Sequence, residues 1–416
     1  MEVLHRCCAG LDVHQQSVVA CVRVVDADRV KSEVRTFDTT TSGLLSLSSW
    51  LEEHGCRHVA MEATGVYWKP VWHVLEQTCQ LVLANAAHVK GVPGRKTDVK
   101  DAEWLADLLA HGLIRASFVP PTVIQDLRAL MRTRKQLVRE MARNTQRIQK
   151  TLEDANIKIA GVVSDVLGKS GRAILDALAR GETDPEKLVA LTSGKLKAPR
   201  EKLIEALRGN VRDHHRFLIK LHLDQIDALR RAVADLEVRV GEHLQPFRKN
   251  VELLTSMPGL SETAARVVVS EIGHDMGRFP SAPHLISWAG LCPRNDESAG
   301  KRRSTRIRHG APWLKTTLIQ CAWAAIRKKD SYLRAQFHRI KTRAGAMKAI
   351  VAVAASMLTA VWHMLTQGVE YRELTGAYLD KRDTTKISNR LVRRLENLGF
   401  VVTLSAAARD ARLPAS

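Results

Sequence analysis

The sequence lacks the cysteine spacing that builds a disulfide framework or a zinc site. Its seven cysteines are scattered, their number is odd, and no two of them form a C-x-x-C pair. This usage argues against a disulfide-rich secreted domain and against a zinc-binding module. We therefore expect a protein of a reducing, cytoplasmic compartment.

Long apolar runs are also missing. The first residues lack the apolar segment of a secretory signal, and the most apolar later stretch, Ala349 to Leu365, contains Ser356, Thr359 and His363. A helix that spans a membrane needs about 20 predominantly apolar residues. We expect a buried core helix in this stretch and no membrane partner.

Acidic residues are outnumbered. Lysine and arginine number 64 against 44 aspartates and glutamates, which gives the 416-residue chain a formal net charge of +20. Such an excess is typical of proteins that bind a polyanion, and nucleic acid is the leading partner. A soluble protein whose charge is only solvated surface is the alternative that composition leaves open.

The chain is longer than one hydrophobic core usually organises. Its patterns divide it into segments 1–118, 119–250, 251–375 and 376–416. We expect an α/β domain, a helical linker with an insertion, a mainly α-helical domain, and a charged tail that is partly disordered.

The first segment alternates between strand and helix patterns. Strands are expected at Cys7–Leu11, Ser17–Val25 and Glu33–Thr39, and a last helix at Val99–His111. The elements expected between them are a helix at Leu44–Glu53, a strand at His58–Met61, a helix at Val66–Gln77 and a strand at Leu81–Ala84. The order βββαβαβα predicts an RNase H-like fold.

Four carboxylates lie at informative places in that fold. Asp12 ends the first strand, Glu62 follows the fourth, and Asp98 and Asp101 open the last helix, three residues apart on one face. The first and fourth strands of an RNase H-like sheet are neighbours, so these acids converge. Oxygen ligands of this kind select a hard ion, Mg²⁺ with Mn²⁺ as a substitute, for phosphoryl transfer. A turn role for Asp12 and a helix cap at Asp98 are the alternatives.

The second segment carries two helical seams at heptad spacing. The first is interrupted by Arg134 and Asn144. The seams consist of Leu127, Leu130, Leu137, Met141 and Ile148, and of Ile219, Ile226, Leu229, Val233, Leu236 and Val240. They predict a coiled coil, which either closes as a hairpin within one chain or pairs with a second copy. Between them, Asp184 is expected to cap a helix that begins at Pro185.

The third segment begins with a helix-hairpin-helix candidate. A Pro-Gly turn within Leu253–Ser261 joins two helical patterns, and Gly259 is placed to bring backbone N–H groups to a DNA phosphate. A turn that only joins two packed helices is the equal alternative. Helices are expected further on at Pro312–Lys329 and Tyr332–Gln367.

Short motifs in both outer domains resemble those of one family. The sequences GLDVH at 10–14, MEATG at 61–65 and KTDVKDA at 96–102 resemble the acidic motifs of the DEDD insertion-sequence transposases, the family numbered one hundred and ten. The sequences MPGL at 257–260, AGLCP at 289–293 and ESAGK at 297–301 resemble its C-terminal motifs. The resemblance extends from about residue 7 to residue 375, and the segment from Asp165 to Arg212 resembles the family's larger subgroup.

The resemblance implies a RuvC-like N-terminal domain, a coiled coil and a C-terminal transposase domain with a catalytic serine. It places the metal ligands on Asp12, Glu62, Asp98 and Asp101, and the nucleophile on Ser298. It further implies a serine recombinase that acts as a homo-oligomer, a dimer or a tetramer, on donor and target DNA, guided by a bridge RNA.

Ser298 precedes a basic run. The residues Lys301, Arg302, Arg303, Arg306 and Arg308 follow it and are expected to bind nucleic acid. Arginine and lysine can hold a scissile phosphate and offset its developing charge. No adjacent base marks Ser298, so the residues alone favour an ordinary loop serine, and Ser304 is its nearest rival. A second basic patch, between Arg327 and Lys348, suits a nucleic-acid backbone or is a solvated helix face.

Two other functions compete with the transposase. A RuvC-like Holliday-junction endonuclease would use the four acids to cut with water and leave Ser298 inert. A non-catalytic nucleic-acid-binding protein would keep only the fold. Four converging carboxylates beside a phosphate favour an enzyme, since a pure binder gains nothing from them.

Overall fold

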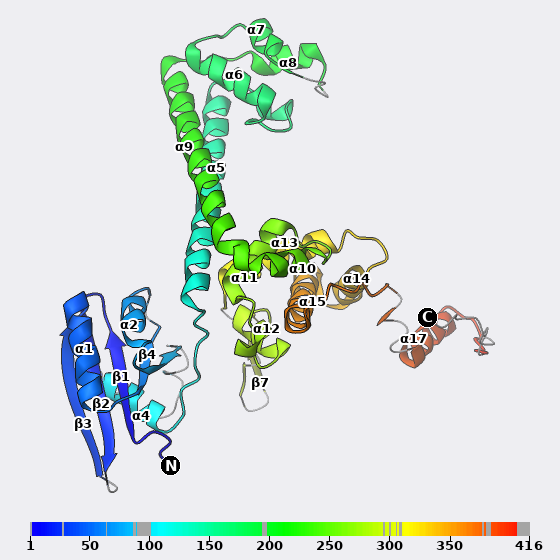
Figure 1. Ribbon diagram of the computed structural model, residues 1–416. Helices are drawn as coiled ribbons and strands as arrows, with labels where there is room; N and C mark the ends of the chain where they lie inside the picture. The colour runs from blue at the N-terminus through cyan, green and yellow to red at the C-terminus, as the bar shows by residue number, and fades with distance from the viewer. Residues whose placement is uncertain are drawn as a thin grey trace. The chain divides into compact units, whose positions relative to one another are not determined.

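The computed structural model describes residues 2–26, 29–63, 65–85, 89, 101–193, 198–293, 296–298, 301–304, 306–307, 310–376, 378–379 and 384–405. The chain folds as two compact units, Met1–Val119 and Pro120–Ser416 (Figure 1). All seven cysteines are free thiols, as their spacing predicted.

The first unit is built on a five-stranded mixed sheet. Its strands are β1 (Cys7–Val13), β2 (Ser17–Asp26), β3 (Arg29–Asp38), β4 (His58–Glu62) and β5 (Gln80–Ala84), in the order β3-β2-β1-β4-β5. The first three strands are antiparallel, and β4 and β5 run parallel to β1. The predicted order of strands and the pairing of the first with the fourth are confirmed, and the mixed α/β sheet is consistent with the predicted RNase H-like fold.

Helices pack on both faces of this sheet. Helices α1 (Thr41–Glu53) and α2 (Trp68–Leu75) share a core with Ala9, Leu11 and Val13 of β1. Helix α4 (Asp101–Ala110) packs on the opposite face, where its Leu109 meets Cys8. Alternate residues of a strand point to opposite faces, so Cys8, Gly10 and Asp12 all face α4.

Gly10 is the point of closest approach between β1 and α4. A Cβ atom there would lie 2.1 Å from the Ala102 carbonyl oxygen and 2.5 Å from the Ala106 backbone nitrogen. Both are helix backbone atoms and cannot swing aside as a long side chain can. Arg23 of β2 reinforces this contact, since its Nη2 lies 3.4 Å from Oδ1 of Asp107 on α4. The glycine therefore fixes how closely Asp101, at the start of α4, approaches the strand that carries Asp12.

Replacing Gly10 by alanine is expected to loosen α4. The added methyl forces the helix outward, and overpacking of this kind costs about 1–3 kcal/mol. Amides of residues 101–110 should then exchange with deuterium about tenfold faster or more, measured by mass spectrometry. Gly161→Ala is the matched control, because a Cβ at Gly161 meets nothing within 4 Å. Unchanged exchange in Gly10→Ala would show that the helix does not depend on this glycine.

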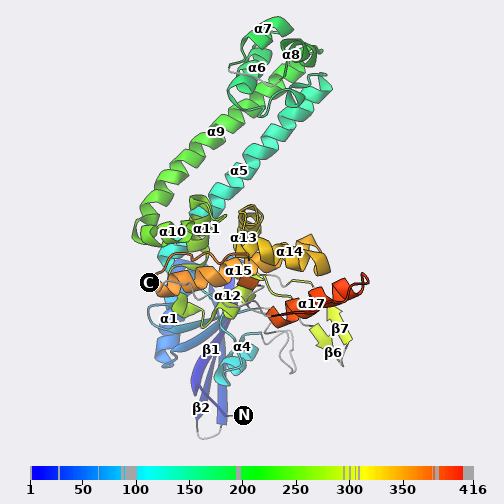
Figure 2. The same cartoon turned by 90° about the vertical axis from the view of Figure 1, so that its right-hand side faces the viewer.

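The second unit begins with two long helices that run side by side. Helix α5 (Thr122–Asp154) leads away and α9 (Asp213–Leu244) returns (Figures 1 and 2). At their tip, α6 (Lys169–Arg180), α7 (Pro185–Ala190) and α8 (Arg200–Leu207) share one core with the helix ends. The Asp184 side chain accepts a hydrogen bond from the Glu186 backbone N–H, with Pro185 in the first turn, as predicted.

The middle of this hairpin is only half-buried. No described residue of α5 between Met131 and Asn144 is buried, and none of α9 between Ile226 and Val240. The predicted seam residues of that stretch are Leu137, Met141, Leu229, Val233 and Leu236, and all are of intermediate burial. Contact within one chain therefore leaves part of the apolar seam exposed to solvent.

The remaining helices gather around α15 (Ala346–Gln367). Helices α10 (Arg248–Thr255), α12 (Ala282–Ala289), α13 (Pro312–Ala325) and α14 (Tyr332–Ala344) all contact it. Among the described helices, α15 alone is long and apolar enough to cross a membrane by length and composition. Its buried residues, including Ile350, Val353 and Met357, pack inside the unit, so the predicted core helix is confirmed.

Two predictions about this region are corrected. The single helix predicted over Tyr332–Gln367 is two helices, because Gly345 has φ +85° and separates α14 from α15. The charged tail contains a further helix, α17 (Thr384–Glu396), which the sequence did not predict.

Candidate active site

Asp12 and Glu62 lie side by side on neighbouring strands. Leu11 of β1 pairs with Met61 of β4 in the parallel ladder, and the two acids are the next residue on each strand. Both are of intermediate burial. The parallel register therefore delivers two carboxylates to one edge of the sheet, where the sequence placed them.

Asp101 approaches from the helix that covers this face. It is the first residue of α4 and is of intermediate burial. Its neighbour Ala102 lies over Gly10, two residues before Asp12. Asp98, the fourth predicted acid, lies outside the described residues. Three of the four acids are thus carried to the same part of the first unit by β1, β4 and α4.

The donor set of this region fits a hard divalent cation. Asp12, Glu62 and Asp101 offer only carboxylate oxygens, which is the chemistry that Mg²⁺ and Mn²⁺ take in proteins. Among the described residues, these three carboxylates do not form a group with all ligand atoms within 4.8 Å of one another. The fold therefore sets where the ends of β1, β4 and α4 lie, whereas the carboxylate oxygens of the three acids are not tightly gathered.

His14 contacts the first acid. Its Nε2 lies 3.0 Å from Oδ2 of Asp12, while His14 itself stands exposed at the turn after β1. A hydrogen bond from the ring orients one oxygen of the carboxylate. Sequence reasoning did not select His14, although its place two residues after Asp12 was visible.

Ser298 lies on a loop whose ends meet. It is the last residue of β6 (Asp296–Ser298) and pairs with Lys301 of β7 (Lys301–Ser304). Pro293 and Ile307 form a further bridge below the hairpin. At the base, a Cβ on Gly310 would lie 2.4 Å from the Gly290 backbone nitrogen. Sequence reasoning expected a loop here and missed both strands.

The predicted basic run follows Ser298 on the same loop. Lys301, Arg302 and Arg303 belong to β7, Arg306 is exposed, and Arg308 lies outside the described residues. The hairpin register places Ser298 opposite the first of these cations. The serine and the basic run are thus presented together by one short hairpin.

Gly259 sits in the predicted turn between α10 and α11 (Glu262–Ile272), with φ +84°. A Cβ there would lie 2.5 Å from the Cys321 carbonyl oxygen and 2.6 Å from the Ala325 backbone nitrogen, both on α13. Packing against α13 already explains a glycine at this position. DNA binding by this turn stays a prediction.

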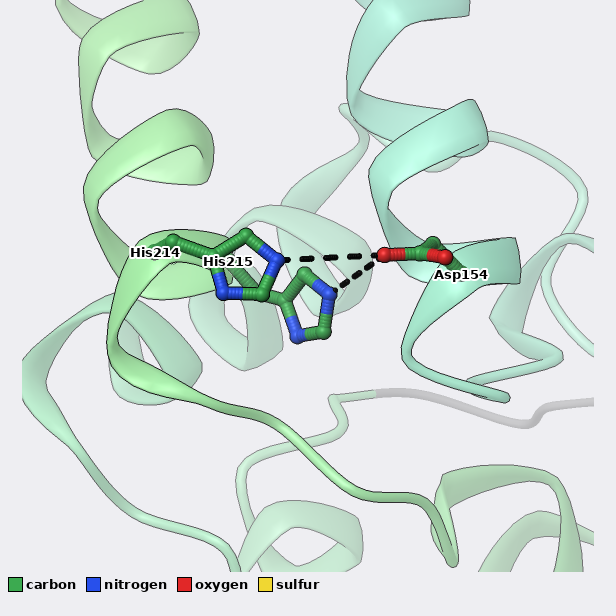
Figure 3. Close-up of side chains that lie close together, drawn as sticks. All are labelled: Asp154, His214 and His215. Atoms are coloured by element: carbon green, nitrogen blue, oxygen red, sulfur yellow. Dashed lines mark hydrogen bonds and ion pairs between the residues drawn. The ribbon is translucent and has the colours of Figure 1, made fainter.

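A third group of titratable side chains was not found from the sequence. His215 Nε2 lies 2.7 Å and His214 Nε2 3.8 Å from Oδ2 of Asp154, where the end of α5 meets the start of α9 (Figure 3). The hydrogen bond from His215 holds the pKa of Asp154 below its usual range. The pattern was hidden because 61 residues separate His215 from Asp154.

This group has ligand atoms close enough for a metal ion, but the proton placement argues against one. The Arg212 backbone N–H donates to Nδ1 of His215, 3.1 Å away. In a neutral ring the proton is then on Nε2, which donates to Asp154 and offers no lone pair to a metal. His215 is also almost fully buried. We therefore assign these residues to holding the two helices together at the tip.

Two family models match the chain. Residues 9–157 match a DEDD domain of the IS110 type, described as a transposase, and residues 251–338 match a domain described as transposase, IS116/IS110/IS902 family. The first range contains all four predicted acids. The second contains Ser298 and the basic run.

Curated relatives cover most of the length. The uncharacterized 43.6 kDa protein of insertion element IS110 from Streptomyces coelicolor is 26% identical over 303 residues, 67% of this chain and 73% of the relative. The transposase for insertion sequence element IS1111A from Coxiella burnetii is 25% identical over 331 residues, 76% of this chain and 79% of the relative. The 42 kDa protein of insertion element IS900 from Mycobacterium paratuberculosis is 25% identical over 336 residues, 71% and 81% of the two chains.

Proposed function

Because the chain belongs to the IS110 family of insertion-sequence transposases and is a DNA transposase, we propose that it cuts and rejoins donor and target DNA by metal-assisted attack of Ser298. The observation that carries this proposal is the placement of Asp12 and Glu62 on paired parallel strands under the helix that begins with Asp101. A protein that only binds nucleic acid has no use for carboxylates at these strand and helix ends.

The acids would hold the divalent metal that DEDD domains use, Mg²⁺ or Mn²⁺ in its place. When bound, such an ion supplies Lewis acidity to phosphoryl oxygens and offsets the negative charge of the transition state. We assign the ligands to Asp12, Glu62, Asp98 and Asp101. His14 would orient the Asp12 carboxylate through its 3.0 Å contact.

Ser298 would form the covalent link to DNA. Its Oγ bonds to the scissile phosphorus as the bond from phosphorus to one strand's oxygen breaks, and the hydroxyl proton passes to a nearby acceptor while that oxygen is protonated. Lys301, Arg302 and Arg303 would offset the charge that develops on the phosphate. The energy of the phosphodiester is kept in the serine–phosphate bond, so a second strand end can attack it and restore DNA.

We propose that the enzyme works as a homo-oligomer, a dimer or a tetramer. The support is the half-buried middle of α5 and α9, where seam residues such as Leu137 and Val233 are incompletely covered within one chain. A second copy would bury them further and gain hydrophobic free energy. Sedimentation that shows only monomer at working concentration would contradict this assembly.

The full proposal includes guidance by a bridge RNA, which the family resemblance implies. Purified protein, a donor plasmid and a target plasmid should give joined product only when RNA transcribed from the element's non-coding end is present. RNA with a scrambled target-pairing loop is the control and should give none. Equal joining without RNA would show that the enzyme needs no guide RNA. Cutting without any joining would favour a RuvC-like endonuclease that uses water.

A further inference from the structure

The second unit contains a cavity of about 790 Å³ between α14 and α17. Arginines from both helices line it, two from each, and each pair is spaced by four residues. They are Arg339 and Arg343 on α14, and Arg390 and Arg394 on α17. His338 and Thr342 complete its polar lining. This cavity lies apart from the Ser298 hairpin in sequence and is not part of the proposed chemistry.

Two hydrogen bonds hold the segment after α15 that contributes Gly376 to the cavity. The Tyr332 backbone N–H donates to the Leu374 carbonyl at 2.7 Å, and the Gly376 N–H donates to Oδ1 of Asp330 at 3.2 Å. Leu379 is buried and also lines the cavity. Leu374 and Gly376, which follow α15, are therefore tied back to the start of α14.

The described residues that line the cavity carry charge of one sign. Among the described residues, its lining contains no carboxylate, and no ion pair joins any of the four arginines to an acid. Guanidinium groups placed around one space repel one another. An anionic ligand offsets that repulsion, and guanidinium matches phosphate oxygens with paired hydrogen bonds.

The spacing of the arginines indicates an extended ligand. Residues four apart on a helix share one face and are about 6 Å apart along its axis. Each helix therefore presents two guanidinium groups in a row, and the two rows line one cavity. A single free phosphate would use only part of this set, whereas a chain of phosphates can engage both rows.

We propose that α14 and α17 form an arginine clamp that binds the phosphodiester backbone of a nucleic acid. The clamp adds a binding site that uses the C-terminal helix α17. It deepens the proposed function, because its ligand is the nucleic acid on which the enzyme acts. Binding can nevertheless be measured without cleavage, so loss of the clamp and loss of the chemistry are distinguishable.

The test compares arginines that line the cavity with cations beside it. Arg343→Gln on α14 is matched by Lys341→Gln, and Arg394→Gln on α17 by Arg393→Gln, since neither control residue lines the cavity. All four are made in the full-length chain that also carries Ser298→Ala, so that no cleavage occurs. Binding of fluorescent duplex DNA and of single-stranded RNA is followed by anisotropy over a range of salt concentrations.

Each lining substitution should weaken binding about tenfold, since a hydrogen bond to a charged group is lost. The slope of log affinity against log salt should fall by about 0.9 for duplex DNA or about 0.7 for a single strand. The matched controls should change neither quantity by that amount, and Arg394→Lys should keep most of the slope. A loss of affinity for only one of the two probes identifies whether the clamp binds DNA or RNA.

Three results would overturn the clamp. Equal losses of affinity in Arg394→Gln and Arg393→Gln would mean that a diffuse electrostatic field, and no specific site, holds the nucleic acid. Unchanged binding in Arg343→Gln and Arg394→Gln, with both probes and with normal circular dichroism, would mean that the cavity binds no backbone. Inorganic phosphate that competes at millimolar concentration as well as a nucleic acid does would likewise contradict an extended ligand.

Discussion

Replacing Ser298 by alanine is expected to remove the covalent protein–DNA product and to lower strand cleavage at least about a thousandfold, the scale seen when a nucleophile is deleted. The change removes only Oγ and leaves the backbone of β6 able to pair with β7. Labelled DNA from the reaction, run on a denaturing gel, should show a slow, protease-sensitive band with the parent enzyme. That band should be missing with Ser298→Ala.

Ser304→Ala is the matched control for this experiment. Ser304 lies on the partner strand β7, within the basic run. Its replacement by alanine therefore removes the same atom, Oγ, from the same hairpin. It should cut and form the covalent product at the parent rate. If Ser298→Ala still cuts, and neither the parent enzyme nor Ser298→Ala forms a covalent band, water is the nucleophile and the enzyme is a nuclease of the RuvC-like kind.

The role of Ser298 also marks a limit of sequence reasoning. A nucleophile is usually recognised by a base beside it, and the motif around Ser298 contains none. Only the family resemblance selected it. The strands that carry it were missed as well, because Asp296–Ser298 and Lys301–Ser304 lack apolar residues at alternate positions. Their pairing depends on a loop whose base is closed by Gly290 and Gly310.

The acidic region was easier to predict. Apolar strands such as β1, in which Cys8 to Leu11 are all buried, produce a strong pattern, and the strand order then fixes which ends are neighbours. Asp12 and Glu62 followed directly from that order. The contact of Gly10 with α4 did not, because a glycine in a strand does not reveal which backbone passes over it.

Long-range packing explains the other differences. One glycine inside a helical pattern costs only about 1 kcal/mol, so the break at Gly345 is decided by how α14 and α15 pack. The contact of His215 with Asp154 depends on the register of two long helices. Helix α17 lies in a charged tail whose composition favoured disorder, and nothing in its sequence indicates that Arg390 and Arg394 line a cavity with α14.

The second large effect is expected at the proposed metal ligands. Asp12→Asn keeps the size of the side chain and removes its charge, so it should lower strand cleavage at least about a hundredfold, since metal assistance contributes several kcal/mol to such reactions. EDTA should abolish cleavage by the parent enzyme, and Mg²⁺ or Mn²⁺ should restore it. Affinity for duplex DNA should stay within about twofold, because the basic surfaces are unchanged.

Asp26→Asn controls for the loss of one negative charge from the same sheet. Asp26 is exposed at the end of β2, whereas Asp12 is the next-to-last residue of β1 and lies beside Glu62. Binding of Mn²⁺, followed by electron paramagnetic resonance in the absence of DNA, supplies a readout that does not depend on turnover. Asp12→Asn should weaken Mn²⁺ binding and Asp26→Asn should not. Cleavage that persists in EDTA, or Mn²⁺ binding that is unchanged in Asp12→Asn, would place the metal elsewhere and leave these carboxylates without their assigned role.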